Sequence, residues 1–579
     1  MPSSAESIAV NDAVRDKFWP RIRGLITPYW RSEERGLAWL LLIAVIGLSL
    51  FDVAADVFIN SWYKDFYNAL QNKDVTAFTH LMLVFCGIAA VAILAAVYRL
   101  YLTQMLTIRW RRWLTEQHFS RWLAHKNYYH LEQGGYTDNP DQRLSEDLND
   151  FTANTLSLGL GLISTVVSLV SFSVILWGVS GSIEVFGISV PGYMFWCALL
   201  YAAVGSWLTH RIGRRLIGLS NRQQRYEADL RFSMVRVREN AESIALYDGE
   251  PSEHKRLSGR FGLVWTNFWN IMGVQKRLKF FTTGYGQIAL VFPFIVAAPR
   301  YFTGKIELGE LMQINSAFGS VQQSFSWFIE AYVTLAGWRA TCDRLLSFRQ
   351  AMADNEQRPQ AIDVEHLGSG LTIRNLGLRL ADGRQLLANA SLAIAPGERV
   401  MLSGRSGSGK STLLRAMGNL WPAGQGSIQL PAQRSLFLPQ KPYIPLGTLA
   451  EALSYPQVPG EHPAERYAQV LQTCRLAHLI PHLDDSRHWQ RSLSPGEQQR
   501  LAFARALLYA PAWLYLDEAT SAMDEEDEAA LYQALIDQLP GLSILSVGHR
   551  SSLKPLHTRH VRLDRLQLQA SGHNSPTAV

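Results

Sequence analysis

The chain has few cysteines and no recognisable export signal. Four of its 579 residues are cysteine, and two of them, Cys86 and Cys197, lie inside apolar runs. This usage indicates neither a disulfide framework nor a zinc cluster. The N-terminal stretch MPSSAESIAVNDAVRDKFW carries three acidic residues and lacks an apolar core with a small-residue cleavage site. A cleaved secretion signal is therefore not expected, and the first apolar run is expected to serve as the targeting element.

Charge is also scarce over the first 340 residues, where long uncharged runs dominate. The whole chain is 48% hydrophobic and 18% charged, so the average hides two different parts. A membrane part followed by a soluble part would give this asymmetry. The length of 579 residues likewise exceeds what one ordinary domain needs.

Six apolar runs are long enough to cross a bilayer as helices. About 20 apolar residues span the ~30 Å hydrocarbon layer at 1.5 Å per residue. A soluble helical core holds one or two such runs, so six of them predict a polytopic membrane domain. The runs lie at 36–59, 81–98, within 151–183, within 185–210, at 280–299 and at 311–329.

The basic residues between these runs predict the orientation of the chain. Residues 1–35, 106–154 and 211–279 hold six, six and fourteen Lys and Arg, whereas the alternate connections hold two, none and two. Basic loops resist translocation, so both termini are expected in the cytoplasm. Because the basic runs adjoin spans, their side chains are expected to reach lipid headgroups rather than nucleic acid. The two long inner connections are expected to continue the spans as helices.

The second part contains a phosphate-binding motif. A strand-like segment, 398–402, precedes GRSGSGKST, and a helical segment follows. In GxxxxGK[ST] loops the backbone N–H groups surround phosphate oxygens, the lysine neutralises the outer phosphates, and the serine can bind Mg²⁺. The motif predicts ATP and Mg²⁺ as ligands. The expected nucleotide contacts are Gly404, Arg405, Ser406, Gly407, Ser408, Gly409, Lys410, Ser411 and Thr412.

Further strand-like segments end in polar residues suited to nucleotide hydrolysis. Asp517 ends one such segment and can hold Mg²⁺, while Glu518 is placed to polarise an attacking water. His549 follows another, and a contact with the γ-phosphate is favoured over the ordinary surface role of a lone histidine. Gln440 is interpreted as an amide near the metal rather than a simple loop residue. We expect Glu518, His549, Gln440 and Lys410 to act in hydrolysis, and Ser411, Gln440 and Asp517 to hold the metal.

The order of these motifs, with LSPGEQQR (493–500) and SAMD (521–524) between them, resembles the ATP-binding cassette ATPases. The resemblance implies that two cassettes face each other and that Ser494 and Gly496 bind the γ-phosphate held by the partner. Asp524 is included among the nucleotide-binding residues on the same ground. One cassette per chain then implies a homodimer. Two departures stand out, LSPGE in place of LSGGQ and the aliphatic Leu380 where an aromatic residue often stacks on adenine.

The membrane part resembles the domain shared by BacA/SbmA-type transporters and the subfamily D fatty-acyl transporters. FYNALQNKD (66–74), WRRWLTEQHFSRWL (110–123) and NPDQRLSEDL (139–148) carry this resemblance, and ENAESIALYDGE (239–250) looks like the coupling segment of that group. It implies a type IV exporter-like fold, with six transmembrane helices fused to an α/β P-loop nucleotide-binding domain. We predict a membrane domain over 1–350, a linker over 351–369, the cassette over 370–567 and a polar tail over 568–579.

The function predicted from the sequence is ATP-driven transport across the inner membrane by a homodimer. Relatives in these groups move peptides, cobalamin or acyl-CoA, so both the cargo and its direction stay open. A cassette ATPase that senses without a cargo of its own is the alternative, whereas action on ribosomes or DNA does not fit six spans. Asp52, Asp56 and Asn60 share one face of the first span. They line either a transport pathway or the outer headgroup region.

Overall fold

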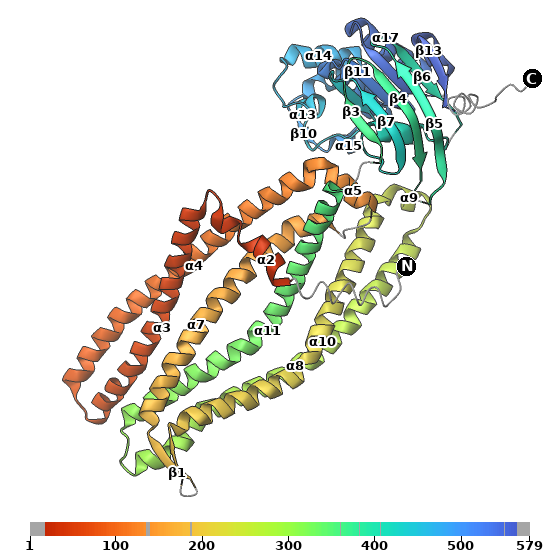
Figure 1. Ribbon diagram of the computed structural model, residues 1–579. Coiled ribbons are helices and arrows are strands. Elements are labelled where there is room, and N and C mark those ends of the chain that lie inside the picture. Colours follow the sequence, from red (N-terminus) through yellow and green to blue (C-terminus); the bar gives the residue numbers. More distant parts are fainter. Residues whose placement is uncertain are drawn as a thin grey trace, which may run out of the picture. The chain divides into compact units, whose positions relative to one another are not determined.

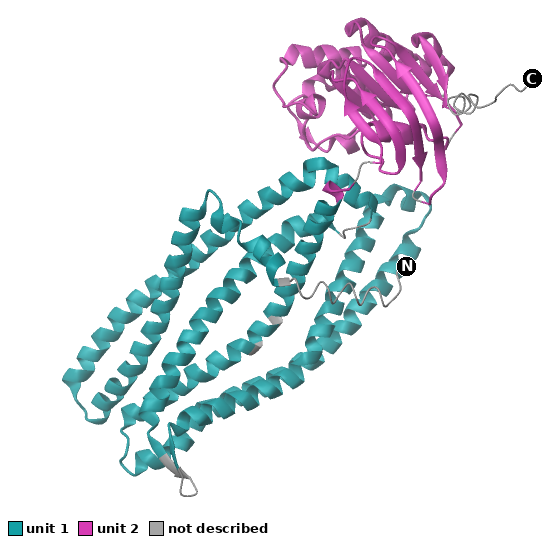
Figure 2. Ribbon diagram, viewed as in Figure 1, with its two compact units in different colours: residues 1–354 teal, residues 355–579 magenta. Residues whose placement is uncertain are grey.

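The computed structural model describes residues 18–134, 139–185, 188–358, 361–380, 382–405, 407–548 and 550–563. The chain divides into two compact units, residues 1–354 (unit 1) and residues 355–579 (unit 2). The two units are coloured separately in Figure 2, and each is described by itself below.

Six helices of more than 30 residues dominate unit 1 (Figure 1). Each contains one of the six apolar runs, and the long inner connections are helical as the sequence predicts. Asp74 caps the second of these helices, since its carboxylate accepts hydrogen bonds from the backbone N–H groups of Thr76 and Ala77, both at 3.0 Å. The six are α3 (Arg35–Gln71), α4 (Val75–Leu123), α7 (Leu148–Ser180), α8 (Tyr193–Glu239), α10 (Glu250–Phe302) and α11 (Leu308–Glu356).

Short elements connect the long helices. One was not predicted: the third and fourth runs are separated by an antiparallel pair of strands, β1 and β2, between Gly181 and Gly192, which have φ of 64° and 60°. Glycine adopts positive φ values readily, so the two glycines that flank this link were the signal in the sequence for a turn at each of its ends. The short elements of unit 1 are α2 (Phe18–Ile26), η1 (Tyr29–Arg31), η2 (Ala124–Lys126), α5 (Asn127–Gly134), α6 (Pro140–Gln142), η3 (Arg143–Asp147), β1 (Ser182–Val185), β2 (Ile188–Pro191) and α9 (Ala241–Leu246).

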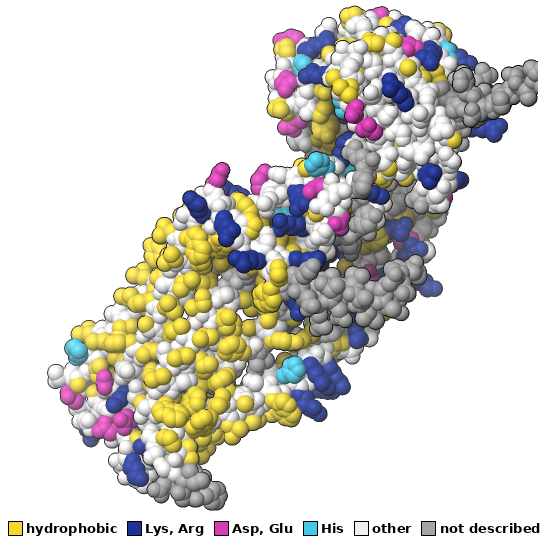
Figure 3. Space-filling view, viewed as in Figure 1, with side chains coloured by type: hydrophobic (Ala, Val, Ile, Leu, Met, Phe, Trp, Pro, Cys, Tyr) yellow, Lys and Arg dark blue, Asp and Glu magenta, His cyan; other side chains and the backbone are white. Residues whose placement is uncertain are grey.

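The surface of unit 1 is apolar over the spans. Figure 3 shows hydrophobic side chains over much of the face in view, and residues such as Leu83, Ile93 and Val174 are more than 60% exposed. Among the described residues, α3, α4, α7 and α10 are long and apolar enough by themselves to cross a membrane. Helices α8 and α11 are of similar length but more polar. An apolar exterior of this extent is typical of a surface that lipid covers.

Two large sheets form the framework of unit 2. The larger is parallel, in the order β13-β6-β12-β11-β8, and the smaller has the order β3-β7-β4-β5 with β3 parallel to β7 and the other pairs antiparallel. The segment expected as a linker, 351–369, contains the end of α11 and strand β3. The strands are β3 (Asp363–His366), β4 (Leu371–Arg379), β5 (Gln385–Ile394), β6 (Arg399–Ser403), β7 (Gly424–Leu430), β8 (Ser435–Leu438), β11 (Trp513–Asp517), β12 (Ser543–Val547) and β13 (Arg559–Arg562).

The parallel sheet is buried on both faces. In β11, Leu514 and Leu516 belong to one hydrophobic cluster, while Trp513 and Tyr515 belong to the other. Helices cover one face, and the smaller sheet together with the helix after β6 covers the other, which makes the central strands rigid supports for the loops at their ends. The remaining elements are α12 (Lys410–Met417), β9 (Gly447–Thr448), α13 (Leu449–Ser454), α14 (Ala464–Thr473), η4 (Ala477–His482), β10 (Ser486–Arg487), α15 (Trp489–Ser492), α16 (Pro495–Tyr509), α17 (Glu525–Gln538) and η5 (Ser551–Leu556).

Candidate nucleotide site

The topology of the parallel sheet brings the predicted motifs to one edge. Strands β6, β12, β11 and β8 are neighbours in that order, with Val547 aligned with Leu402 on one side and Asp517 on the other. Carboxyl ends of parallel strands meet at the same edge, where open α/β sheets bind their ligands. The loops after these strands carry the phosphate-binding motif, His549, Glu518 and Gln440.

The phosphate loop runs from β6 into α12 with the backbone that its glycines require. Gly407 and Gly409 have φ of 77° and 98°, values that side chains other than glycine rarely allow. Lys410 is buried, and its Nζ donates to the carbonyl oxygens of Gly404 (2.9 Å) and Arg405 (3.0 Å). The ammonium group is thus held against the loop that it is expected to serve. Ser406 lies outside the described residues.

Two predicted metal ligands are in direct contact. The Ser411 hydroxyl donates to the Asp517 carboxylate at 2.9 Å. Burial raises the pKa of the Asp517 carboxyl above its ordinary value; the hydrogen bond from Ser411 opposes this rise, and the charge of Glu518 adds to it. A partly buried carboxylate paired with a hydroxyl is an oxygen donor set that Mg²⁺ accepts, and a cation would relieve the cost of burying the charge. The residues present therefore fit the metal.

Glu518 occupies a strained position beside these ligands. Its φ of 49° is unusual for a non-glycine residue, and its backbone N–H donates to the carbonyl of Val547 at 3.1 Å. The Gln440 side-chain amide lies 3.5 Å from the Glu518 carboxylate. The fold thus brings Gln440, Ser411, Asp517 and Glu518 together. His549 lies outside the described residues.

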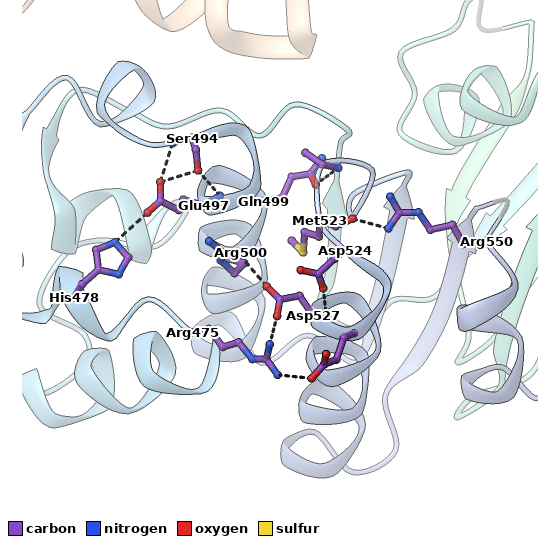
Figure 4. A network of polar contacts seen from close by, with 12 residues as sticks. Arg475, His478, Ser494, Glu497, Gln499, Arg500, Met523, Asp524, Asp527 and Arg550 are labelled. Carbon is purple, nitrogen blue, oxygen red and sulfur yellow. Dashed lines mark hydrogen bonds and ion pairs between the residues drawn. The ribbon is translucent and has the colours of Figure 1, made fainter.

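The LSPGEQQR turn forms the start of α16 and is shown in Figure 4. Ser494 is the N-cap, and Glu497 completes a capping box: its carboxylate accepts from the Ser494 N–H (2.9 Å) and hydroxyl (2.7 Å). His478 lies 3.0 Å from the other oxygen of Glu497. Burial acts to raise the pKa of Glu497, but the hydrogen bonds from Ser494 and His478 outweigh it and hold the pKa below its usual value.

The turn makes no hydrogen bond or ion pair with residues 404–412 among the part of the chain that the structure describes. It lies instead against the SAMD segment, because a Cβ added to Gly496 would approach the Ala522 carbonyl oxygen to 3.1 Å. Asp524 caps α17, with its carboxylate accepting from the backbone N–H of Asp527 at 2.7 Å. Its carboxylate therefore has a structural partner, and its predicted role in nucleotide binding stays a prediction.

Two side chains that the sequence analysis did not single out join these segments. Gln499 is 4% exposed and contacts both Gln440 and the SAMD segment, while Arg550 donates to the carbonyls of Met523 (2.6 Å) and Ser521 (3.2 Å). Gln499 stands in the quoted motif, but its burial depends on the tertiary packing of α16. No sequence pattern marks that burial.

The turn before β5 contains the aliphatic Leu380. Its N–H donates to the carbonyl of Arg384 at 2.8 Å, and the described residues of this turn, 380 and 382–384, include no aromatic side chain. The indole N–H of Trp421 donates to the carbonyl of Arg379 at 3.0 Å, so an aromatic ring from another segment lies beside the turn.

Comparison with known proteins is consistent with this geometry. Two family models match, "ABC transporter transmembrane region 2" over residues 22–302 and "ABC transporter" over residues 387–521. An uncharacterized ABC transporter ATP-binding protein of Haemophilus influenzae is 37% identical over 94% of this chain and 92% of its own length. The chain belongs to the ABC transporter family. This ABC transporter chain is also 34% identical to the Escherichia coli inner membrane ABC transporter ATP-binding protein YddA, over 91% of this chain and 94% of the relative.

More distant similarities place the transporter within its family. The human lysosomal cobalamin transporter ABCD4 is 28% identical over 94% of each chain. A solved bacterial Atm1-family ABC exporter with ATP bound has a TM-score of 0.70 at 19% identity, covering 89% of this chain and 92% of that one. The predicted fold, a type IV exporter-like membrane domain fused to a P-loop cassette, is thereby confirmed. One membrane region and one cassette make the chain an ABC half-transporter with relatives in subfamily D.

Proposed function

We propose that the chain works as a homodimer that hydrolyses ATP at two shared sites and moves a solute across the inner membrane. The observation that carries the proposal is the division of polar groups within one cassette. Lys410, Ser411, Asp517 and Glu518 gather at the sheet edge, while the Ser494 turn has its contacts elsewhere. A turn that does not serve its own phosphate loop is available to a partner's.

Each chain contributes one half of a site through its phosphate loop. Lys410 binds the outer phosphates, and the loop N–H groups orient the triphosphate. Ser411, Gln440 and Asp517 would hold Mg²⁺, which would supply positive charge for the triphosphate. Glu518 polarises the attacking water and accepts its proton, and His549 contacts the γ-phosphate.

The partner contributes the other half through the start of α16. The first N–H groups of a helix lack intrahelical partners, and the helix dipole favours an anion there. Ser494 and Gly496 would present this end to the γ-phosphate of the facing chain. Hydrolysis removes that contact and releases the pair, which is how the nucleotide would bias the membrane domain between its states.

Exposed aromatic residues on α10 support the proposal that a second copy of the chain packs against this unit. Trp265, Phe268 and Trp269 are each more than half exposed. Trp265 precedes the apolar run at 280–299 by about 22 Å along the helix, so lipid would not cover it. Exposed aromatic side chains outside a bilayer are typical of protein interfaces.

The cargo is proposed by class: a peptide, a cobalamin-like molecule or a lipid or acyl compound. The name of the human relative supports a cobalamin-like solute, and the name of the E. coli relative supports the inner membrane. We place both termini in the cytoplasm, on the basis of the basic connections.

Mixing two inactive variants tests the shared sites. Lys410→Ala should inactivate the phosphate-loop half and Ser494→Ala the opposite half. Co-expression should restore up to about a quarter of wild-type ATPase activity, because half of randomly paired dimers are mixed and each has one complete site. Each variant paired with itself is the control. An ATP site built within one chain predicts no restoration.

Flux measurements test the transport step. Right-side-out and inside-out vesicles should be loaded with peptide, cobalamin and acyl-CoA probes, with Glu518→Gln vesicles as the matched control. ATP-dependent flux of one probe in one orientation is expected. ATPase activity that ignores every probe, without flux, would instead favour a cassette protein that senses without a cargo.

A further inference from the structure

Gln499 makes hydrogen bonds to two segments of the cassette, the one that contains Gln440 and the SAMD segment. Its side-chain amide donates to the backbone carbonyl of Gln440 (3.0 Å) and lies 3.1 Å from the Ser521 hydroxyl, while its carbonyl oxygen accepts from the backbone N–H of Ala522 (2.9 Å). The residue is 4% exposed. A buried amide whose donors and acceptor are all used fixes the segments that it touches.

One of these segments belongs to the chain's own hydrolytic centre. Gln440 follows β8, and its side chain lies 3.5 Å from the Glu518 carboxylate. The same helix holds this segment a second time, since the buried Arg505 donates to the carbonyl of Tyr443 at 3.0 Å. A shift of α16 would therefore move Gln440 relative to Glu518.

The other segment faces the proposed partner. Ser521 and Ala522 are exposed in the single chain. Gly496, at the turn expected to bind the partner's nucleotide, approaches the Ala522 carbonyl so closely that a Cβ would lie 3.1 Å from it. Arg550, the residue after His549, donates hydrogen bonds to the carbonyls of Ser521 and Met523 in the same segment. The Gly496 backbone thus lies close to the Ala522 carbonyl, and Gln499 accepts a hydrogen bond from the Ala522 N–H.

We infer that Gln499 is a positioning residue that links the two ATP sites of the dimer. Nucleotide bound against the Ser494 turn of one chain would be sensed through Ala522 and Gln499, and the Gln440 backbone of that chain would respond. Hydrolysis at the two sites is then cooperative. This inference rests on the proposed homodimer with shared sites.

Two variants of Gln499 distinguish its contact with Gln440 from its contact with Ala522. Gln499→Leu keeps the volume and removes every hydrogen bond, whereas Gln499→Glu keeps the acceptor for Ala522 but sets a carboxylate against the Gln440 carbonyl. Gln533→Ala, on the exposed face of α17 with a single contact to Asp537, is the matched control. ATPase rates over a range of ATP concentrations, the affinity for a fluorescent ATP analogue and the unfolding midpoint should be measured on the full chain in lipid nanodiscs.

The wild type and Gln533→Ala should show a Hill coefficient above 1. Gln499→Leu should lower kcat about tenfold, the effect expected when buried hydrogen-bond groups lose their partner, and bring the Hill coefficient to 1 with analogue affinity nearly unchanged. Gln499→Glu should lose cooperativity, and its unfolding midpoint should fall because the buried carboxylate then faces the Gln440 carbonyl. If Gln499→Leu fails to fold, Gln499→Glu carries the test.

Two results would overturn the inference. One is retained cooperativity in Gln499→Glu, and the other is a wild-type Hill coefficient of 1. Either result together with successful mixing of Lys410→Ala and Ser494→Ala would leave the shared-site homodimer intact. Failure of the mixing experiment would instead reject the proposed function itself.

Discussion

The two units bury polar groups for different purposes. In the cassette, Lys410 and Gln499 direct their hydrogen bonds at loops that converge on one edge of a sheet. In the membrane unit, two buried asparagines tie pairs of helices together at separate places. Asn60 on α3 donates to the carbonyl of Gln313 on α11 (3.1 Å), and Asn267 on α10 donates to the carbonyl of Leu219 on α8 (3.0 Å).

This difference explains why the ligand of the cassette can be inferred from its polar groups, whereas the cargo of the membrane unit cannot. Converging polar groups narrow the class of ligand, because Lys410 supplies a cation while Ser411 and Asp517 supply oxygen atoms at one edge of the sheet. Dispersed polar groups define helix contacts, and many cargoes are compatible with the same contacts. The predictions below test that contrast by changing one polar group at a time.

The largest effect is expected at Glu518. Glu518→Gln should lower the ATPase rate at least about 100-fold, because the amide cannot accept the proton of the attacking water. ATP binding should be unchanged, since the phosphate loop is untouched. Steady-state hydrolysis and analogue binding by purified protein check both statements. Glu525→Gln, an exposed carboxylate at the start of α17, is the control, and near-normal turnover in Glu518→Gln would show that another group acts on the water.

The cassette could be predicted from its sequence because its motifs are local. GRSGSGKST fixes the phosphate loop within nine residues, and the strand before each polar group fixes its position at the sheet edge. The contact of Ser411 with Asp517 joins residues 106 positions apart, yet it follows from the order of parallel strands. The burial of Gln499 does not follow in this way, because it depends on how α16 packs against the segments that contain Gln440 and Ala522.

The membrane unit was predictable in outline and less so in its contacts. Apolar run length gave the helices, since a bilayer of fixed thickness sets that length. The pairing of helices depends on polar side chains far apart in the chain, such as Asp147 with Arg344, and no periodicity encodes it. The β1–β2 strands were missed because a short link between two apolar runs needs no particular structure.

The second effect concerns the buried carboxylate of Asp147. It accepts from Arg344 at 2.6 and 2.9 Å and from Arg143 at 2.9 Å, and it is 2% exposed. Asp147→Asn should destabilise the protein by about 2 kcal/mol, because two arginines then face a neutral amide. Unfolding in detergent measures this.

The matched control is an exposed ion pair on the same unit. Asp229 and Arg260 lie 3.5 Å apart with side chains 44% and 46% exposed. Asp229→Asn should cost less than about 0.5 kcal/mol. Equal losses at Asp147 and Asp229 would mean that the buried pair does not fasten α11 to the start of α7.

The third effect separates two interpretations of α3. Asp52 pairs with Arg99 on α4 at 3.0 Å, Asp56 is exposed, and Asn60 is buried. The three residues share a helical face but not an environment. Asp52→Asn combined with Asp56→Asn should reduce flux roughly fivefold while sparing basal ATPase activity, if carboxylates in the span line the pathway. Unchanged flux in the vesicle assay would favour the headgroup interpretation, and Asp56→Asn alone isolates the residue that is not paired with Arg99.

The smallest effect brings the comparison back to the cassette, where a functional group lowers stability. Because the pKa of the Asp517 carboxyl is raised on folding, chiefly by burial, its protonated form is favoured in the folded state. That contribution is complete below the ordinary pKa of an aspartate and is lost as pH rises through the raised value. At pH 7 the charged carboxylate therefore costs stability when no metal is present.

Asp517→Asn should accordingly raise the unfolding midpoint by about 2 °C at pH 7 without nucleotide or metal, although it should abolish hydrolysis. The neutral amide oxygen can still accept from Ser411, so the fold loses no hydrogen bond. Below the ordinary pKa of an aspartate the gain should vanish, because the wild-type carboxyl is then protonated as well. A midpoint that falls at pH 7 would mean that the charge stabilises the empty site, and the burial of Asp517 would then have to be balanced by Lys410 rather than left for a metal ion.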